Sequence, residues 1–280
     1  MWKSLLFVPV LEDRFVKSVP SRGASAVVLD LEASIAQDRK TEARNALAHA
    51  VKQLSPDVDV TVRINPLWLD AIRDLEASVI AGVSALHLAR CNSAGDVAAI
   101  DNVVGELEVE RGLAKGSIRL VAMLESPGAV LSAEKIAAAS PRMVGLTLGV
   151  EDYATEMGTK TSEDLLRRAG FDVIQAARAA HISPLVVPAS MADFRDLDAL
   201  ETAARYARSL GSSGGYAVHP AQVKVLNEVF APTAEELDWA DRVLAASEDA
   251  ATSGKAVFQV AGQMIDLPLI NRAKRIAANR

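Results

Sequence analysis

Residues 26–64 carry the pattern that decides the fold: the apolar run AVVLDL (26–31), a helical stretch (39–54) and a second apolar run, VDVTVRI (58–64). Both runs are short and rich in β-branched residues, whereas the stretch between them mixes Ala and Leu with charged residues at helical spacing. Short apolar runs separated by a helical segment are typical of parallel strands joined by a crossover helix. The sequence therefore predicts a strand–helix–strand unit here.

The same alternation continues through most of the chain. Six further apolar runs occur, at residues 4–9, 85–89, 118–124, 143–150, 183–189 and 215–219. Eight strands, each followed by a helical stretch such as residues 161–180 or 197–210, match an α/β fold, the TIM (β/α)₈ barrel. The alternative is an open doubly wound sheet, which usually has a glycine-rich first turn. Because residues 8–13 read VPVLED, the barrel is favoured.

The chain continues after the eighth predicted strand. We expect a catalytic barrel domain over residues 1–230 and a C-terminal helical and hairpin extension over residues 231–280. The extension is expected to hold a helix, two short strands and a final helix, at residues 233–249, 255–260, 263–266 and 267–279. A barrel closes without such a tail, so we expect it to serve oligomerisation or to form a lid.

Composition narrows the classes of partner. The 280 residues include 30 Lys and Arg against 36 Asp and Glu, a net charge of −6, which argues against nucleic acid because phosphate binding needs clustered cations. A single cysteine excludes an internal disulfide framework and a Cys-rich zinc site. No apolar run is long enough for a bilayer, and residues 1–14 lack a secretory signal pattern. We expect a cytoplasmic protein that acts on a small molecule.

Polar residues cluster where the predicted strands end, which is the catalytic face of such a barrel. They are Asp30, Glu32, Arg63, Asn65, Arg90, Glu125, Asp152 and His219. Strand alternation places Asp30 and Glu32 on one face. Glu125 and Asp152 follow neighbouring strands and could share an ion, and oxygen ligands favour Mg²⁺.

Two interpretations of these residues stay open. In the first, Asp30 and Glu32 hold metal-bound waters while Arg63 binds a substrate carboxylate or carbonyl through its planar fork. In the second, the carboxylates form a salt-bridge network with Arg63 and Arg90. The cysteine at position 91 has no obvious histidine partner, so we interpret it as an inert thiol.

Taken together, a series of motifs resembles the citrate lyase β-subunit-like (CitE-like) branch of the HpcH/HpaI aldolase/lyase superfamily over nearly the whole chain. The motifs are LFVP (6–9) with Arg14 and Lys17, LDLE (29–32) with Lys40, VRIN (62–65), LES (124–126), GVEDY (149–153), GGYAVHPAQ (214–222), FAP (230–232) and GQMIDLP (262–268). Four positions depart from the usual pattern of that branch: Val10, Ala33, Arg90 and Val187.

The resemblance implies a trimer-forming TIM barrel that binds Mg²⁺ and cleaves a carbon–carbon bond of acyl-CoA thioesters reversibly. By position, Glu125 and Asp152 would ligate Mg²⁺, and Arg63 would contact the reacting oxygens. The expected substrate is a 3-hydroxyacyl-CoA of malyl, citramalyl or citryl type, and its products are an acyl-CoA and a 2-keto acid.

The resemblance also assigns roles outside the barrel mouth. Arg14 and Lys17 match positions near the CoA contacts, and Asp266 matches an aspartate that enters a neighbouring subunit's site as acid and base. The substitution at Val10 raises the question of the shape of the CoA entrance. Three alternatives remain: a thioesterase on the same site, a pyruvate-type aldolase on free acids, and a non-catalytic barrel that binds acyl-CoA or scaffolds a complex.

Overall fold

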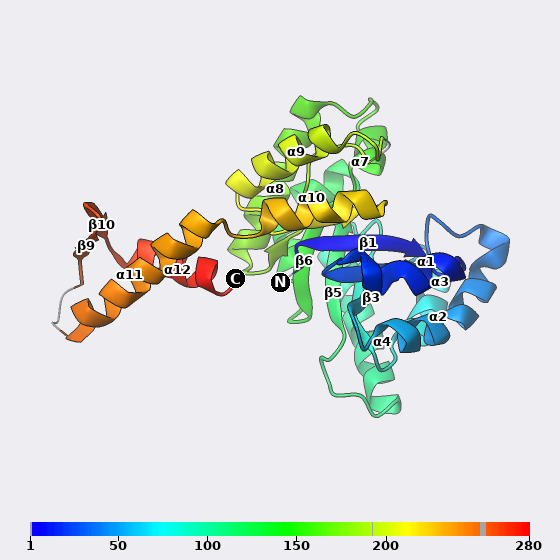
Figure 1. Cartoon of the computed structure of the whole chain (residues 1–280). Helices are drawn as coiled ribbons and strands as arrows, with labels where there is room; N and C mark the ends of the chain where they lie inside the picture. The colour runs from blue at the N-terminus through cyan, green and yellow to red at the C-terminus, as the bar shows by residue number, and fades with distance from the viewer. Residues whose placement is uncertain (1, 192, 253–255) are drawn as a thin grey trace. The chain divides into compact units, whose positions relative to one another are not determined.

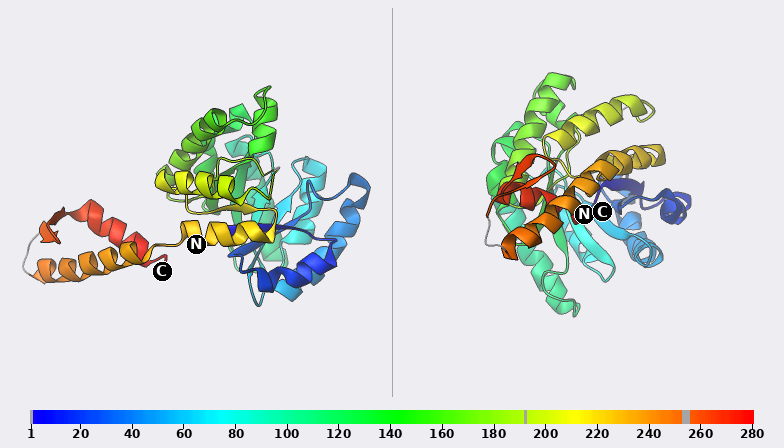
Figure 2. Two further views of the ribbon diagram at one scale, coloured as in Figure 1. Left: turned by 45° about the horizontal axis from the view of Figure 1, so that its top comes forward. Right: turned by 60° about the vertical axis from the view of Figure 1, so that its left-hand side comes forward.

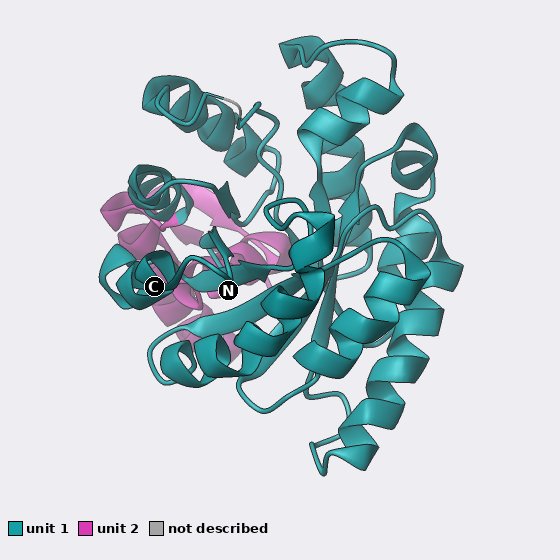
Figure 3. Cartoon of the chain, turned by 90° about the vertical axis from the view of Figure 1, so that its right-hand side faces the viewer, with its two compact units in different colours: residues 1–230 teal, residues 231–280 magenta. Residues whose placement is uncertain are grey.

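The computed structural model describes residues 2–191, 193–252 and 256–280. The chain divides into two compact units, residues 1–230 and 231–280, drawn in two colours in Figure 3. The first unit contains the strands and helices expected of the barrel. The second contains the expected helix, hairpin and final helix, although the predicted strand at 255–260 begins at a residue outside the described part of the chain.

Eight parallel strands form one curled sheet in the first unit (Figure 1). They are β1 (Ser4–Pro9), β2 (Ala26–Asp30), β3 (Asp59–Ile64), β4 (Val83–Leu88), β5 (Arg119–Leu124), β6 (Met143–Leu148), β7 (Ser183–Pro184) and β8 (Gly215–Ala217). Their order in the sheet is β7-β6-β5-β4-β3-β2-β1-β8, so each strand up to β7 pairs with its neighbour in sequence and β8 returns to β1. This half-barrel confirms the predicted TIM-barrel-like α/β class.

Helices follow the strands and lie outside the curled sheet (Figures 1 and 2). They are α1 (Asp13–Ser18), α2 (Lys40–Leu54), α3 (Trp68–Ser78), α4 (Ala94–Glu110), α5 (Pro127–Leu131), α6 (Ala133–Ala137), α7 (Val150–Glu156), α8 (Glu163–Ala179), α9 (Leu197–Ser209) and α10 (Pro220–Phe230), with 3-10 turns at Val19–Arg22 and Gln37–Arg39. Side-chain caps start several of them; Ser93 and Asp96 form a reciprocal capping box at α4. In the described residues no helix is long and apolar enough to cross a membrane.

Strand alternation divides the first unit's apolar residues into two clusters. The larger one fills the space between the sheet and its helices and includes Leu29, Val62 and Leu86. The smaller one includes Leu5, Val28, Val121, Leu185 and Tyr216, which alternate with the first set along their strands. These five side chains lie inside the curled sheet, below the carboxyl ends of its strands. We call these strand ends the mouth of the sheet.

The two ends of the sheet depart from the prediction. Strands were expected over 183–189 and 215–219, but β7 has two residues and β8 has three. Other hydrogen bonds replace the missing strand ladder. The Ser212 hydroxyl accepts a hydrogen bond from the N–H of Val186 at 3.2 Å, and the Ser213 N–H donates to the carbonyl of Pro184 at 2.9 Å. A proline has no N–H to extend a ladder, which explains the short pairing.

The second unit is a helical hairpin with a small β-ribbon. It comprises α11 (Ala234–Thr252), β9 (Phe258–Val260), β10 (Gln263–Ile265) and α12 (Leu267–Ala277). The two strands pair antiparallel around a two-residue turn, in which Ala261 and Gly262 both have positive φ, 50° and 81°. Its own small core is formed by Ala240, Val243, Ile265 and Ala273.

Candidate active site

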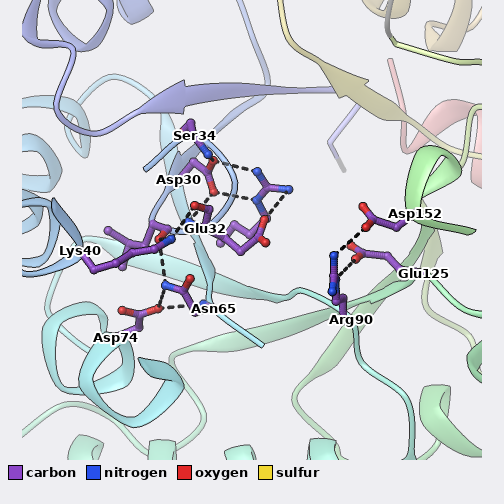
Figure 4. A network of polar contacts seen from close by, with 11 residues as sticks. Asp30, Glu32, Ser34, Lys40, Asn65, Asp74, Arg90, Glu125 and Asp152 are labelled. Carbon is purple, nitrogen blue, oxygen red and sulfur yellow. Dashed lines mark hydrogen bonds and ion pairs between the residues drawn. The ribbon is translucent and has the colours of Figure 1, made fainter. Parts of the chain in front are cut away.

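The mouth of the sheet is organised first by an ion pair between β2 and β3. Asp30 and Arg63 are direct partners in the register of these strands. The guanidinium donates to both carboxylate oxygens, Nε to Oδ1 at 2.7 Å and Nη2 to Oδ2 at 2.8 Å (Figure 4). The same two oxygens accept the N–H groups of Glu32 and Ser34, each at 2.9 Å. Asp30 is therefore a fully bonded carboxylate that orients Arg63, which favours the salt-bridge interpretation for this residue.

Electrostatics keep this pair ionised. Burial works to raise the pKa of Asp30, but the hydrogen bonds and charge of Arg63 outweigh it and hold that pKa below its usual value. Arg63 also lies 3.3 Å from Oε2 of Glu32, a residue that follows the end of β2, and its guanidinium stacks 4.5 Å above the centre of the Phe7 ring. The result is a rigid, oriented cation at the barrel mouth.

A second set of bonds fixes the loop after β2. Lys40 Nζ donates to the carbonyl oxygens of Leu31 at 2.7 Å and Glu32 at 2.6 Å. The Asn65 side-chain amide donates to Leu31 as well and to Asp74 Oδ2, at 2.8 and 2.6 Å (Figure 4). Burial lowers the pKa of Lys40. Lys40 and Asn65 belong to motifs visible in the sequence, whereas Asp74 reaches the network from α3 and was missed.

The two predicted metal ligands come together on the opposite side of the mouth, around Arg90. Arg90 Nη2 donates to Asp152 Oδ1 at 2.8 Å, and its Nε lies 3.8 Å from Glu125 Oε2 (Figure 4). Glu125 is buried at the end of β5, while Asp152 is about half exposed in α7. Arg90 adopts a positive φ of 48°, an uncommon backbone conformation for a side-chain-bearing residue.

Glu125 is the most perturbed carboxylate of the mouth. Burial, and then the charges of Asp152 and Glu32, raise its pKa to about 7, although Arg63 and Arg90 act in the opposite direction. In the described residues no cluster of three or more His, Cys, Asp or Glu side chains is placed to hold a metal ion. Mg²⁺ commonly takes only one or two protein carboxylates and completes its shell with water and substrate. Two neighbouring carboxylates, one of raised pKa, fit such an ion.

Gly149 determines where the Glu125 side chain can lie. Its N–H donates to the carbonyl of Leu124 at 2.9 Å, which draws the end of β6 against the end of β5. A Cβ atom at this position would lie 2.4 Å from Glu125 Cγ, far closer than any normal contact. Only glycine allows the carboxylate to occupy its place beside Asp152.

We therefore expect Gly149→Ala to displace Glu125 and weaken Mg²⁺ affinity by about 10- to 100-fold, as changes that misplace a metal ligand commonly do. Isothermal titration with MgCl₂ measures this. The matched control is Gly128→Ala, because a Cβ there meets nothing within 4 Å. Equal affinities for the two variants would show that Gly149 does not position the ligand.

Three predicted site residues belong to other elements of the chain. Arg14 and Lys17 are exposed on α1, which follows β1; Arg14 lies 4.6 Å from the centre of the Phe15 ring, and Lys17 pairs with Asp13 at 2.5 Å. Asp266 belongs to the second unit, where it precedes α12 without capping it through its side chain.

Two other positions discussed from the sequence are core residues. Val10 is buried in the core between sheet and helices, so its side chain is a packing residue in this structure. The thiol of Cys91 is buried, and burial raises its pKa to about 12. A thiol of such a pKa is a poor nucleophile, in agreement with the interpretation of Cys91 as inert.

A buried polar chain beneath the mouth was missed in the sequence. Thr61 donates its hydroxyl proton to the carbonyl of Val27 at 2.8 Å, so it can only accept from His87 Nε2, 2.9 Å away. His87 Nδ1 then accepts the hydroxyl proton of Tyr216 at 2.9 Å. Burial and the charge of Arg63 lower the pKa of His87 to about 3, so the ring is neutral. The alternation of side chains along residues 85–89 could have predicted that His87 faces the inside of the sheet.

These features define the class of protein: a TIM-barrel-like α/β protein with charged side chains gathered at the carboxyl ends of its strands. The model of the HpcH/HpaI aldolase/citrate lyase family matches residues 3–220. The chain belongs to this family, and it is an enzyme of the citrate lyase β-like lyase type, a group of acyl-CoA carbon–carbon lyases in which some relatives are thioesterases.

Individual proteins agree with that assignment. Citrate lyase subunit beta of Haemophilus influenzae is 33% identical over 278 residues, covering 98% of this chain and 95% of that protein. The (3S)-malyl-CoA thioesterase of Cereibacter sphaeroides is 30% identical over 268 residues, covering 95% and 90%. The structure of protein CitE from Mycobacterium tuberculosis in complex with magnesium, acetoacetate and coenzyme A has a TM-score of 0.74 at 30% identity, covering 99% and 97%.

Proposed function

We propose that this protein is a Mg²⁺-dependent carbon–carbon lyase. It cleaves, or in reverse forms, a 3-hydroxyacyl-CoA thioester of malyl, citramalyl or citryl type, with an acyl-CoA and a 2-keto acid as products. One observation carries the proposal: the buried Glu125, with a pKa of about 7, lies with Asp152 on the same mouth as the fixed guanidinium of Arg63. The magnesium and coenzyme A bound to the CitE protein support it.

Each residue of the mouth has a place in this reaction. Glu125 and Asp152 would hold Mg²⁺. Arg90 forms ion pairs with both carboxylates, and its ion pair with Asp152 would break when Asp152 binds the metal. When bound, Mg²⁺ supplies Lewis-acid polarisation of the substrate's hydroxyl and carboxylate oxygens. Arg63, held by Asp30, donates hydrogen bonds to the oxygen on which charge develops. Because Arg63 is already oriented, it stabilises that charge without reorganisation.

The protonation step and the CoA contacts use residues outside the mouth. In this proposal Asp266 of a neighbouring subunit of a homotrimer protonates the enolate carbon, or removes that proton in the reverse direction. The Asp266 side chain is exposed, and the adjacent Met264 and Leu267 are 67% and 64% exposed, as expected of residues that another subunit covers. Arg14 and Lys17 would bind CoA phosphates from α1.

The raised pKa of Glu125 gives Mg²⁺ binding a defined pH dependence. Below about pH 7 the folded protein carries a proton on Glu125 that must leave before the carboxylate binds the ion. We expect the apparent Mg²⁺ affinity to fall about tenfold per pH unit below 7 and to level off above 8. Titration calorimetry in buffers of different ionisation enthalpy should show release of about one proton near pH 6; release of none would contradict the assignment of Glu125.

A second candidate, hydrolysis of the thioester on the same site, is favoured by the similarity to a (3S)-malyl-CoA thioesterase. The two reactions differ in their products. Purified protein with Mg²⁺ is mixed with malyl-, citramalyl- and citryl-CoA, and mass spectrometry follows all products. A shorter acyl-CoA together with a keto acid identifies the lyase. Free CoA together with an intact hydroxy acid identifies the thioesterase and rejects the lyase.

A further inference from the structure

A small cavity lies directly beneath the mouth, inside the curled sheet. Its volume is about 50 Å³, compared with the 10–15 Å³ or so that one water molecule requires. The side chains that form its walls include Phe7, Met123, Thr147, Leu185, Val187 and Tyr216. Gly149 also lines it, and the same glycine contacts Glu125. Gly149 therefore lies between the cavity and the carboxylate that would hold the metal.

The walls are almost entirely apolar. Among the described residues that line the cavity, none carries a charge at neutral pH. The Tyr216 hydroxyl is engaged with His87, whose lowered pKa keeps it neutral, and the Tyr216 ring stacks on Phe7 with centroids 5.3 Å apart. Arg63 stacks on the Phe7 ring and holds Asp30 with its Nε and Nη2, and it is not one of the lining residues. A carboxylate placed in this cavity would lose its hydration, and no lining residue among those described carries a charge to pair with it.

Only one substituent of the proposed substrate could occupy this cavity. In a 3-hydroxyacyl thioester of this kind, the carbon that bears the hydroxyl carries four substituents. In the proposed reaction the hydroxyl and the carboxylate would bind the charged groups at the mouth, and the thioester arm would run outward because CoA is far larger than the cavity. The fourth substituent is the one that remains to point inward.

Resting on the proposed lyase function, we infer that this cavity selects a substrate whose fourth substituent is a methyl group, rather than a hydrogen atom or a carboxymethyl group. The substrate is then citramalyl-CoA. Its hydroxyl proton is lost, the bond from the carbinol carbon to the thioester α-carbon breaks, and protonation of the resulting enolate carbon gives pyruvate and acetyl-CoA. Val187, one of the four departures noted in the sequence, helps to make the cavity apolar.

The first test compares kcat/KM of the unmodified protein on malyl-, citramalyl- and citryl-CoA, whose fourth substituents are hydrogen, methyl and carboxymethyl. Because burying one methyl group in an apolar pocket is worth about 10- to 200-fold, citramalyl-CoA should exceed malyl-CoA by at least about tenfold. Citryl-CoA should be the poorest substrate of the three. A preference for malyl- or citryl-CoA overturns the inference.

A variant pair tests the cavity itself. Thr147→Ile fills part of the cavity and should lower the ratio of citramalyl-CoA to malyl-CoA turnover by about tenfold or more. Thr147→Val keeps the shape of the side chain and should leave that ratio unchanged. Because both readouts are ratios measured on one protein sample, a loss of folded material cancels. An equal ratio in both variants overturns the inference.

A binding measurement separates this inference from the proposed function. Titration of pyruvate, glyoxylate and oxaloacetate into the protein with Mg²⁺ should give the tightest binding for pyruvate, whether or not any thioester is cleaved. That order without cleavage supports the cavity and rejects the lyase activity. Cleavage of all three thioesters with no preference for the methyl group supports the lyase and rejects the cavity as selector.

Discussion

Glu125→Gln eliminates Mg²⁺-dependent turnover, with an expected loss in kcat/KM of about 10³-fold or more. The amide keeps the size of the side chain but removes the charge that a hard cation requires. Mg²⁺ affinity, measured by calorimetry, falls with it. The exposed Glu76 of α3 provides the matched control, because Glu76→Gln removes the same charge away from the mouth. Full activity of Glu125→Gln would reject the metal assignment.

The same substitution should increase stability in the absence of metal. Burial, together with Asp152 and Glu32, makes the charged form of Glu125 unfavourable, which is why its pKa reaches about 7. At pH 8 the neutral glutamine avoids this unfavourable charge, so the free energy of unfolding should rise by about 1–3 kcal/mol. Thermal and urea unfolding in EDTA measure the difference. A lower stability would show that Glu125 has a structural role.

Arg63→Met should have the second largest effect, on both activity and stability. It removes the donor at the developing oxyanion, which costs about 10²- to 10³-fold in kcat. It also leaves Asp30, which is 1% exposed, without its partner, and an unpaired buried charge costs about 3–5 kcal/mol. Arg63→Lys should recover part of the stability but little of the activity, because an ammonium cannot replace the bidentate guanidinium.

The double variant Asp30→Asn with Arg63→Met separates these two effects. Removing both charges should restore most of the stability lost in Arg63→Met without restoring turnover. In the unmodified protein the pKa of Asp30 is lowered, so the pair contributes stability above the unfolded pKa of about 4, which is lost as pH falls through the folded value. The double variant should lack this loss of stability at low pH. Recovered activity would remove Arg63 from the reaction.

Much of this site follows from local sequence patterns. Alternation at the end of the second predicted strand places Asp30 and Glu32 on one face, and both contact Arg63, although the observed β2 ends at Asp30 and Glu32 follows it. The end of each strand predicts that Glu125 and Asp152 approach the same mouth. These inferences succeed because a parallel barrel brings all strand ends to one side, so order along the chain is sufficient.

The remainder depends on contacts that no local pattern contains. The need for glycine at position 149 arises from a side chain on the neighbouring strand. His87 joins Tyr216 across the inside of the sheet, 129 residues apart in sequence. The sequence left the effect of Val10 on the CoA entrance open, and in the structure its side chain packs in the core. The pairing of β7 with β6 is short because Pro184 has no N–H for the ladder, and the hydroxyls of Ser212 and Ser213 bond Val186 and Pro184 instead.

The ratio of keto acid to acyl-CoA formed in a single time course with Mg²⁺ shows whether the protein is a metal-dependent carbon–carbon lyase. Citramalyl-CoA is the substrate of choice, and a parallel reaction with EDTA controls for the metal. We expect one pyruvate for each acetyl-CoA, with neither product formed in EDTA. Free CoA accumulating without pyruvate, or turnover that persists in EDTA, would contradict it.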